Sequence, residues 1–278
     1  MSNDLTASRA ATPRSYLMCP PTHFDVTYAI NPWMRLDAPV DRDLAMRQWE
    51  TLRQTYASLG HSVSVIDPVP GLPDMVFAAN GATVIDGTVL GVRFRYPQRA
   101  GEAEAYLSWF RSRDWASVHV PVQANEGEGD ILVAGDTVLA GYGFRTAIAA
   151  HDELRARLGV PVVSLRLVDP RFYHLDTAVA VLRDDNVAYF PGAFDACSRD
   201  VLRARFPHAL LVDERDAEAF GCNAMSDGHH VIVSAQATGF VDQLRAAGYD
   251  AVPIDTSELR KAGGSVKCCT LELRGERK

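Results

Sequence analysis

The sequence predicts an α/β protein built from five ββαβ-like units that close into a pseudo-symmetric ring, the architecture of a propeller. Three observations in the 278 residues support this fold class. Hairpin signals recur at intervals of roughly fifty residues, a period that indicates a propeller or a solenoid. Helical segments lie between the hairpins, and both chain ends carry an apolar strand. The alternative is an open α/β sheet with unrelated hairpins.

The hairpins are recognised by short apolar runs on either side of a turn signal. Residues 84–90 contain the pair Asp86-Gly87, which favours a two-residue hairpin turn. Similar patterns occupy residues 132–139, 178–190 and 225–233, which places the four turns near 86, 135, 184 and 227.

The helices are recognised by apolar residues at helical spacing. A helix over 41–59 begins after Pro39 and carries Leu44, Trp49, Leu52 and Tyr56 on one side. Further helices are expected over 102–112, 146–158, 197–205 and 237–246. Short strands follow several of them, at 61–66, 161–165 and 210–212.

The fifth unit is expected to form from the two ends of the chain. A strand around 266–273 would pair with one around 15–19, closing the ring and leaving no sheet edge. Residues 1–14 are polar and lack the apolar stretch of a signal peptide, so they are expected to be a flexible N-terminus. Residues 15–278 are expected to form a single catalytic domain.

Composition narrows the class of partner. The net charge of −7 argues against nucleic acid and anionic membranes and suits a cationic small molecule. No apolar run approaches the ~18 residues that a membrane span needs. The five cysteines are odd in number and form no Cys-x-x-Cys pair, so neither a disulfide framework nor a zinc ribbon is expected. A reducing cytoplasm is the simplest compartment.

One polar or nucleophilic residue opens each expected unit. Their separations are 46, 48, 48 and 46 residues, and they are Asn80, Glu126, His174, Cys222 and Cys268. In a ring of repeats, equivalent positions converge on the central pore. A glutamate, a histidine and a cysteine from distant parts of the chain are therefore expected to meet there.

This set suits covalent catalysis by a thiol. A thiolate attacks while histidine moves protons, and a carboxylate orients its partners. The acids Asp74, Asp130 and Asp176 lie near the same strand starts. A pocket rich in carboxylates beside a nucleophilic cysteine favours a cation with an electrophilic carbon, such as a guanidinium.

Four motifs in order resemble the guanidine-modifying (pentein) superfamily, which includes dimethylargininases, arginine deiminases and amidinotransferases. They are Leu-Pro-Asp-Met-Val-Phe at 72–77, Glu-Gly-Glu-Gly-Asp at 126–130, His-Leu-Asp-Thr at 174–177 and Gly-Gly-Ser-Val-Lys-Cys at 263–268. The resemblance runs from about residue 16 to 275. It implies a five-bladed α/β propeller, in agreement with the repeat pattern.

The resemblance also implies roles for individual residues. Cys268 corresponds to the nucleophile, His174 to the general acid and base, and Glu126 to the catalytic carboxylate. Asp176 resembles a guanidinium-binding carboxylate. Since the family motif is often Glu-Gly-Gly-Asp, the extra residue here leaves Glu128 as the alternative to Glu126. Cys269 resembles a second cysteine of some dimethylargininases, with a structural role.

The substrate-binding set is completed by Asp74, Asn80, Arg99 and Arg145. The two arginines resemble those that clamp a substrate α-carboxylate, as guanidinium groups can do with two hydrogen bonds. Many members carry an aspartate where this chain has Asn80, and succinylarginine dihydrolases carry asparagine there. The exact guanidino substrate is therefore left open.

The expected activity is hydrolysis of an N-methylated arginine or an arginine-like compound to citrulline or a related ureido product, through a thiouronium on Cys268. Glu126 and Asp176 are expected to hold the cation, and neither a metal nor another cofactor is expected. The alternatives are an amidinotransferase and a non-catalytic interaction protein on the same fold. The oligomeric state is left open. A metal role for His229-His230 is disfavoured, because neighbouring residues on a strand diverge.

Overall fold

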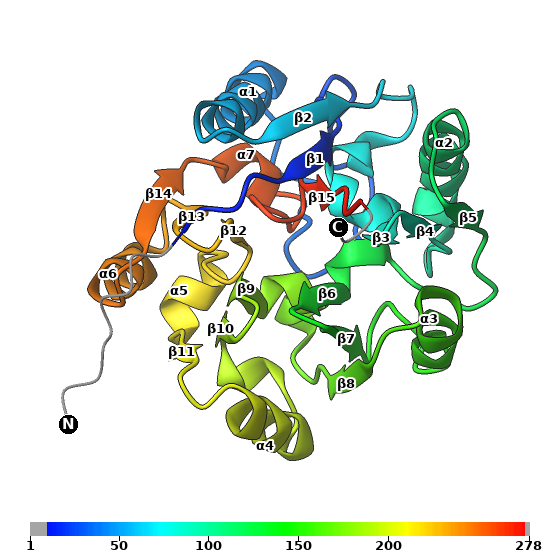
Figure 1. Ribbon diagram of the computed structural model, residues 1–278. Coiled ribbons are helices and arrows are strands. Elements are labelled where there is room, and N and C mark those ends of the chain that lie inside the picture. Colours follow the sequence, from blue (N-terminus) through cyan, green and yellow to red (C-terminus); the bar gives the residue numbers. More distant parts are fainter. Residues whose placement is uncertain (1–9, 276–278) are drawn as a thin grey trace, which may run out of the picture.

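Five separate three-stranded sheets surround a central axis in the computed structural model, which describes residues 10–275 (Figure 1). In each sheet an antiparallel hairpin is extended by a parallel outer strand. The sheet formed by the chain ends contains β15 (Leu271–Glu272), β1 (Ser15–Met18) and β2 (Ser62–Val65). The others are β3 (Thr83–Ile85), β4 (Thr88–Leu90) and β5 (Ser117–His119); β6 (Ile131–Ala134), β7 (Thr137–Tyr142) and β8 (Val162–Arg166); β9 (Val179–Arg183), β10 (Asn186–Tyr189) and β11 (Leu210–Leu211); β12 (Met225–Ser226), β13 (His230–Ser234) and β14 (Asp250–Ile254).

One longer helix precedes the outer strand of each sheet and lies on the periphery (Figure 1). These helices are α1 (Arg42–Ser58), α2 (Ala100–Arg111), α3 (Ala150–Leu158), α4 (Ala196–Arg205) and α6 (Thr238–Ala246). Two shorter helices are α5 (Glu214–Glu218) and α7 (Ser257–Arg260). Short 3₁₀ helices are η1 (Pro73–Val76), η2 (Ala78–Gly81), η3 (Pro97–Arg99), η4 (Gly127–Gly129), η5 (Pro170–Phe172), η6 (Leu175–Thr177) and η7 (Pro191–Ala193).

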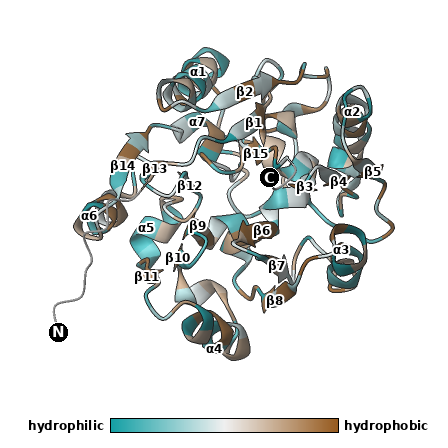
Figure 2. Ribbon diagram, viewed as in Figure 1, coloured by the Kyte–Doolittle hydropathy of each residue, from teal (hydrophilic) through white to brown (hydrophobic). Residues whose placement is uncertain are grey.

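Local sequence accounts for these elements. The Asp41 side chain accepts a hydrogen bond from Leu44 N and caps α1, which buries Trp49, Leu52 and Tyr56. In the β3–β4 turn both Asp86 and Gly87 have positive φ, as a type I′ hairpin turn requires. Figure 2 shows hydrophilic and hydrophobic segments on the outer helices, as expected for helices with one buried face.

The predicted fold class is confirmed: four internal hairpins have the predicted turns, and β1 pairs with β15. The expectation that closure leaves no sheet edge is wrong. The innermost strands of neighbouring sheets, such as β6 and β9, pack against each other without pairing, so each sheet keeps its own edges. The ring is therefore closed by side-chain packing.

Helix α3 and the C-terminal strand are each shorter than predicted. In both cases the missing residues form contacts at the centre of the ring. Helix α3 begins at Ala150 instead of 146, since Thr146 N donates to the Asp130 carboxylate. The C-terminal strand contains only Leu271–Glu272, since residues 265–268 form a turn held by Asn223.

The predicted flexible segment 1–14 falls mainly outside the described residues. Within the described part, Thr12 N donates to Asp227 O and Arg14 forms an ion pair with Glu272. A single domain over 15–278 stays a prediction. In the described range no helix is long and apolar enough to cross a membrane.

Candidate active site

Glu126 and His174 occupy equivalent positions in neighbouring units. Each comes directly before a 3₁₀ helix, η4 or η6, at the start of an inner strand. Both side chains are buried, and His174 Nε2 lies 2.8 Å from Glu126 Oε2. The repeat spacing therefore brings the predicted catalytic carboxylate next to the histidine that is predicted to act as general acid and base.

The Glu126 carboxylate has further partners. Its Oε2 accepts from Arg145 Nη1 at 2.8 Å, and its Oε1 accepts from Arg95 N at 3.2 Å. Burial opposes ionisation, but the Arg145 charge and the His174 hydrogen bond hold the pKa of Glu126 well below its usual range. Both oxygens of Glu126 thus orient protein groups, and its expected role in holding a substrate cation stays a prediction.

The Glu126 contact determines how His174 presents its ring. An ionised carboxylate can only accept, so Nε2 carries the hydrogen of this bond. In the neutral ring Nδ1 then keeps its lone pair. That atom is buried and has no hydrogen-bond partner among the described residues. His174 is thus oriented as a proton acceptor.

Cys268 lies in the turn before β15, and its side chain is 2 % exposed. Asn223 Nδ2 donates to Cys268 Sγ at 3.1 Å, and the Cys268 backbone N–H donates to Asn223 Oδ1 at 3.1 Å. The same amide donates to Asp176 O and accepts from Ser265 N. Asn223 therefore fixes both the nucleophile turn and the strand start that carries Asp176.

Asp176 lies beside the thiol. Its Oδ2 is 3.3 Å from Cys268 Sγ, whereas its Oδ1 is buried and unpartnered in the described chain. Burial raises the pKa of Asp176 to about 7. Burial, and then the nearby Asp176, raise the pKa of the Cys268 thiol well above its usual value. Burial and the nearby carboxylate thus favour the protonated thiol.

A second buried carboxylate, Asp74, belongs to the same centre. Its Oδ2 accepts from Tyr28 OH at 2.9 Å, and its Oδ1 has no hydrogen-bond partner within residues 10–275. Burial raises the pKa of Asp74, although Arg99 opposes the shift. Arg99 Nε lies 3.8 Å from Asp74 Oδ2.

Asn80 links Arg99 to the catalytic groups. Its Oδ1 accepts from Arg99 Nη1 at 2.8 Å, and its Nδ2 donates to Glu126 O at 3.0 Å. A Cβ at Gly129 would lie 2.2 Å from Asn80 Nδ2 and 3.2 Å from His174 Nδ1, so glycine is required where these groups converge. The asparagine thus lies beside the histidine.

Arg99 and Arg145, the two arginines predicted to bind a substrate α-carboxylate, differ in their surroundings. Arg99 donates through Nε and Nη2 to both oxygens of Glu102, at 2.8 Å each. Arg145 lies over the rings of Tyr96 and Tyr173 and also donates to Ile30 O. Arg99 is therefore held mainly by the protein, whereas Arg145 lies next to the Glu126–His174 pair.

The structure distinguishes Glu126 from Glu128, the alternative candidate for the catalytic carboxylate. Glu128 accepts from Lys267 Nζ at 2.7 Å and forms an ion pair with Arg274, whereas His174 is bound to Glu126. Asp130 accepts backbone N–H groups from Leu175 and Thr146. These contacts indicate a supporting role for both acids.

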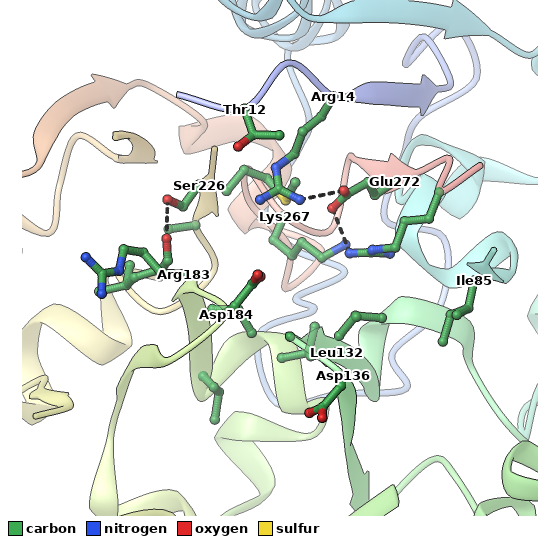
Figure 3. A pocket seen from close by; sticks show the side chains of 18 of the residues that line it. Thr12, Arg14, Ile85, Leu132, Asp136, Arg183, Asp184, Ser226, Lys267 and Glu272 are labelled. Atoms are coloured by element: carbon green, nitrogen blue, oxygen red, sulfur yellow. Dashed lines mark hydrogen bonds and ion pairs between the residues drawn. The ribbon is translucent and has the colours of Figure 1, made fainter. Parts of the chain in front are cut away.

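A cavity of about 590 Å³ opens beside the turns of three hairpins, with Lys267 in its lining (Figure 3). Its lining includes Arg14, Lys267 and Glu272, and Glu272 accepts from Arg14 at 2.7 Å. The lining comes largely from the inner strands and the hairpin turns and includes none of Cys268, His174 and Glu126, so the cavity is separate from the candidate active site.

Sequence reasoning missed Asn223 and Tyr28. The repeat spacing pointed to Cys222, whose side chain packs in the hydrophobic core, and the functional amide is one residue later. No pattern pointed to Tyr28, which lies on an irregular segment that also supplies Ile30 O to Arg145.

A buried thiol, a histidine–glutamate pair and two partly unpartnered carboxylates at the centre of five ββαβ units define a guanidine-modifying enzyme of the pentein superfamily. Residues 22–275 match the family described as "N,N dimethylarginine dimethylhydrolase, eukaryotic". The chain belongs to this family, and it is a hydrolase.

Similar proteins agree with this assignment. The chain is 55% identical over 267 residues to an N(G),N(G)-dimethylarginine dimethylaminohydrolase of Mycobacterium tuberculosis, an alignment that covers 96% of this chain and 88% of the relative. It is 38% identical over 263 residues to the bifunctional arginine dihydrolase/ornithine cyclodeaminase ArgZ of Synechocystis sp., covering 92% of this chain and 37% of that protein. The substrate-bound N-terminal domain of ArgZ superposes with a TM-score of 0.91 at 37% identity, covering 94% of this chain and 98% of the domain.

Proposed function

We propose that the chain hydrolyses N-methylated arginine to citrulline and a methylamine through a thiouronium intermediate on Cys268. A protein 55% identical to it is a dimethylarginine dimethylaminohydrolase. The observation that carries the proposal is a set of three buried acceptors without hydrogen-bond partners in the described chain: Asp74 Oδ1, Asp176 Oδ1 and His174 Nδ1. An unsatisfied buried polar group costs about 1–3 kcal/mol. A guanidinium has the N–H donors and the charge to satisfy such a set.

In the first half-reaction the substrate cation offsets the repulsion between Asp176 and the developing thiolate. Cys268 loses its proton to His174, and the thiolate attacks the guanidinium carbon. The imidazolium then gives this proton to the amine nitrogen as the C–N bond breaks. The amine leaves, and a thiouronium remains on Cys268.

In the second half-reaction His174 is neutral again and takes a proton from water, whose oxygen attacks the thiouronium carbon. Collapse forms the C=O bond and breaks the C–S bond. The imidazolium returns its proton to the Cys268 thiolate, and the remaining proton of the attacking hydroxyl passes through solvent to the released amine. The net change is addition of one water and loss of one amine. Glu126 orients and stabilises the imidazolium during both transfers, as a carboxylate does in a catalytic triad.

We assign binding of the substrate's α-carboxylate to Arg145, which lies beside the Glu126–His174 pair. Among the ion pairs of the described residues, Glu126 is its one carboxylate partner. Arg99 is bound to Glu102 and hydrogen-bonded to Asn80, so we assign it to holding Asn80 and Asp74 in place. A direct contact of Arg99 with the substrate carboxylate stays a prediction. The partner is a small cationic guanidino compound.

A second candidate substrate is arginine itself. ArgZ, whose N-terminal domain superposes on this chain, is an arginine dihydrolase. The catalytic groups alone do not discriminate, because the attacked carbon is the same in both substrates. The leaving nitrogen is ammonia for arginine and a methylamine for methylated arginines.

One assay separates these candidates. Purified protein is incubated with asymmetric dimethylarginine, monomethylarginine, arginine and N-succinylarginine, and citrulline, ornithine, ammonia and methylamines are quantified. We expect citrulline and dimethylamine in equal amounts, with the highest kcat/KM for a methylated arginine. A higher kcat/KM for arginine, with ammonia as the amine product, would support the second candidate. An acceptor amine should not increase turnover.

A further inference from the structure

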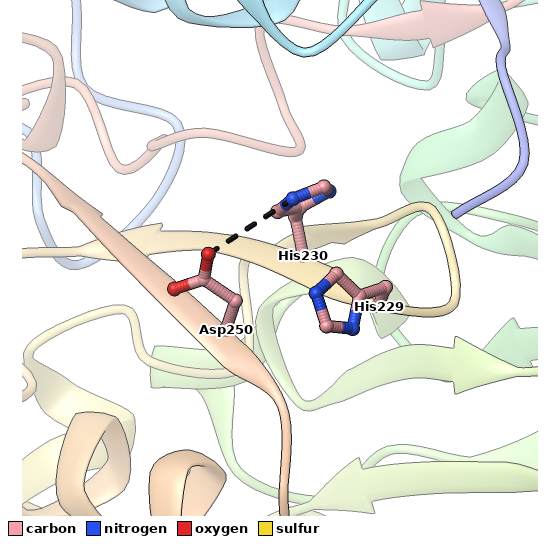
Figure 4. A group of neighbouring side chains, drawn as sticks. All are labelled: His229, His230 and Asp250. Atoms are coloured by element: carbon pink, nitrogen blue, oxygen red, sulfur yellow. Dashed lines mark ion pairs between the residues drawn. The ribbon is translucent and has the colours of Figure 1, made fainter. Parts of the chain in front are cut away.

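We propose that His229, His230 and Asp250 form a binding site for a divalent transition-metal cation, with Zn²⁺ as the best fit, on the sheet β12-β13-β14 (Figure 4). One potential ligand atom from each residue lies within 4.8 Å of the other two. The three residues have no part in the hydrolase chemistry described above. Imidazole nitrogen and carboxylate oxygen are the ligand types that zinc accepts in proteins.

The backbone explains how two adjacent histidines converge. His229 lies outside β13, directly after Gly228, whose φ is +99°, and His230 begins the strand. The alternation of a regular strand therefore does not apply, and the two ring centroids are 4.6 Å apart. The expectation that neighbouring residues diverge here is wrong. Asp250 enters from β14, where it pairs with His230 in parallel register.

A buried carboxylate orients one of the histidines. Asp227 is 1 % exposed, and its Oδ2 lies 2.7 Å from His230 Nδ1. Its Oδ1 accepts the backbone N–H groups of His229 and His230. Asp227 thus holds the hydrogen on His230 Nδ1 and leaves Nε2 with a lone pair, 3.9 Å from Asp250 Oδ2. Metal-bound histidines generally have such a carboxylate on their other nitrogen.

The ring of the second histidine, His229, has a nitrogen that makes no hydrogen bond to the described residues. This atom, Nδ1, is buried. The ring contacts that of His230, the His229 backbone N–H donates to Asp227 Oδ1, and the His229 carbonyl accepts from Asp250 N at 3.0 Å. A bound cation would coordinate one nitrogen of this ring and give the side chain a function.

The coordination chemistry favours Zn²⁺. Three protein ligands plus one water complete a tetrahedral site, with bonds of about 2.0–2.2 Å. The side chain of Asp250 is 61% exposed, so it can rotate toward the histidines without disturbing packing. The arrangement joins the starts of β13 and β14.

The test is Zn²⁺ titration of the full chain in a Cys268→Ser background, so that the thiol cannot bind the metal. We expect one tight Zn²⁺ per chain. His229→Ala and Asp250→Asn should each weaken Zn²⁺ binding by about 10-fold or more, and loss of the supporting carboxylate in Asp227→Asn by about 10–100-fold. His208→Ala removes an exposed histidine elsewhere and should leave the Kd unchanged.

A second readout uses Co²⁺. Its visible d–d bands should indicate tetrahedral nitrogen and oxygen ligands, and they should disappear in His229→Ala while the melting temperature of the metal-free protein is retained. The proposal is overturned if His229→Ala and Asp250→Asn bind Zn²⁺ with the parent affinity. It is equally overturned if His208→Ala weakens binding as much as they do.

Discussion

The contact between Asn223 and Cys268 predicts a large and specific effect of the change Asn223→Asp. The substitution keeps the shape and the Oδ1 acceptor that binds Cys268 N and Ser265 N. It replaces the N–H donor that lies 3.1 Å from Cys268 Sγ by an oxygen. The variant therefore removes a hydrogen bond to the thiolate and places repulsive charge beside it.

The magnitude follows from the type of bond. A hydrogen bond to a charged group contributes about 1.5–3 kcal/mol, and each 1.36 kcal/mol corresponds to a factor of ten in rate. We therefore expect kcat/KM for the best methylated arginine to fall by roughly 10- to 150-fold. The alkaline rise of Cys268 alkylation by iodoacetamide, followed on its tryptic peptide, should move to higher pH.

The assay is continuous citrulline formation over pH 6 to 9, with Asn186→Asp as a control that makes the same chemical change at the first residue of β10, where no catalytic group lies. A purely structural role of Asn223 would lower the melting temperature and leave the pH profile of alkylation in place. Unchanged kcat/KM together with an unshifted alkylation profile would refute our reasoning about thiolate stabilisation.

Further variants test the remaining assignments. Cys268→Ser should abolish turnover, whereas Cys269→Ser should retain most of it; turnover by the Cys268 variant would exclude it as the nucleophile. Asp176→Asn should lower kcat/KM by at least ~100-fold, about 2.7 kcal/mol, and near-normal kinetics would remove Asp176 from the guanidinium site. Burial raises the folded-state pKa of Asp176 from 3.8 to about 7, so its contribution to stability is fully present below pH 3.8 and lost as pH rises through 7. The melting temperature of Asp176→Asn relative to the parent should therefore be higher at pH 8 than at pH 5, and a pH-independent difference would contradict the raised pKa. Glu128→Gln should destabilise the fold by ~3–5 kcal/mol, because buried Lys267 loses its partner, while kcat changes little; a stable protein with abolished kcat would instead make Glu128 catalytic.

The repeat pattern was enough to predict the ring and the meeting of Glu126 with His174. Both residues precede inner strands by the same number of positions, so equivalent backbone places their side chains on one axis. The spacing could not locate Asn223. The spacing instead identified Cys222, one residue earlier. An irregular turn precedes the two-residue strand β12, so the position that faces the site there is not the one that an even spacing predicts.

The long-range contacts that irregular segments make could not be predicted from the sequence. Tyr28 and Ile30 reach the site from a loop without periodicity, and their partners are 46 and 115 residues away. The role of Glu126 also needed coordinates. The sequence predicts a carboxylate at the centre of the ring. The distances show that the Glu126 carboxylate is hydrogen-bonded to both His174 and Arg145.

The covalent intermediate is the central claim, and acid-quenched mass spectrometry during turnover tests it most directly. Trypsin should release residues 268–274, which contain both Cys268 and Cys269, so fragment ions or a Cys269→Ser background must locate the adduct. We predict that the mass of the thiouronium-linked substrate skeleton appears on Cys268 and disappears as substrate is exhausted. A His174→Gly variant loses water activation and, with a substrate whose leaving group departs without protonation, should accumulate the adduct. Citrulline formation at the full steady-state rate by the parent, with no adduct on Cys268 in either protein, would contradict the claim.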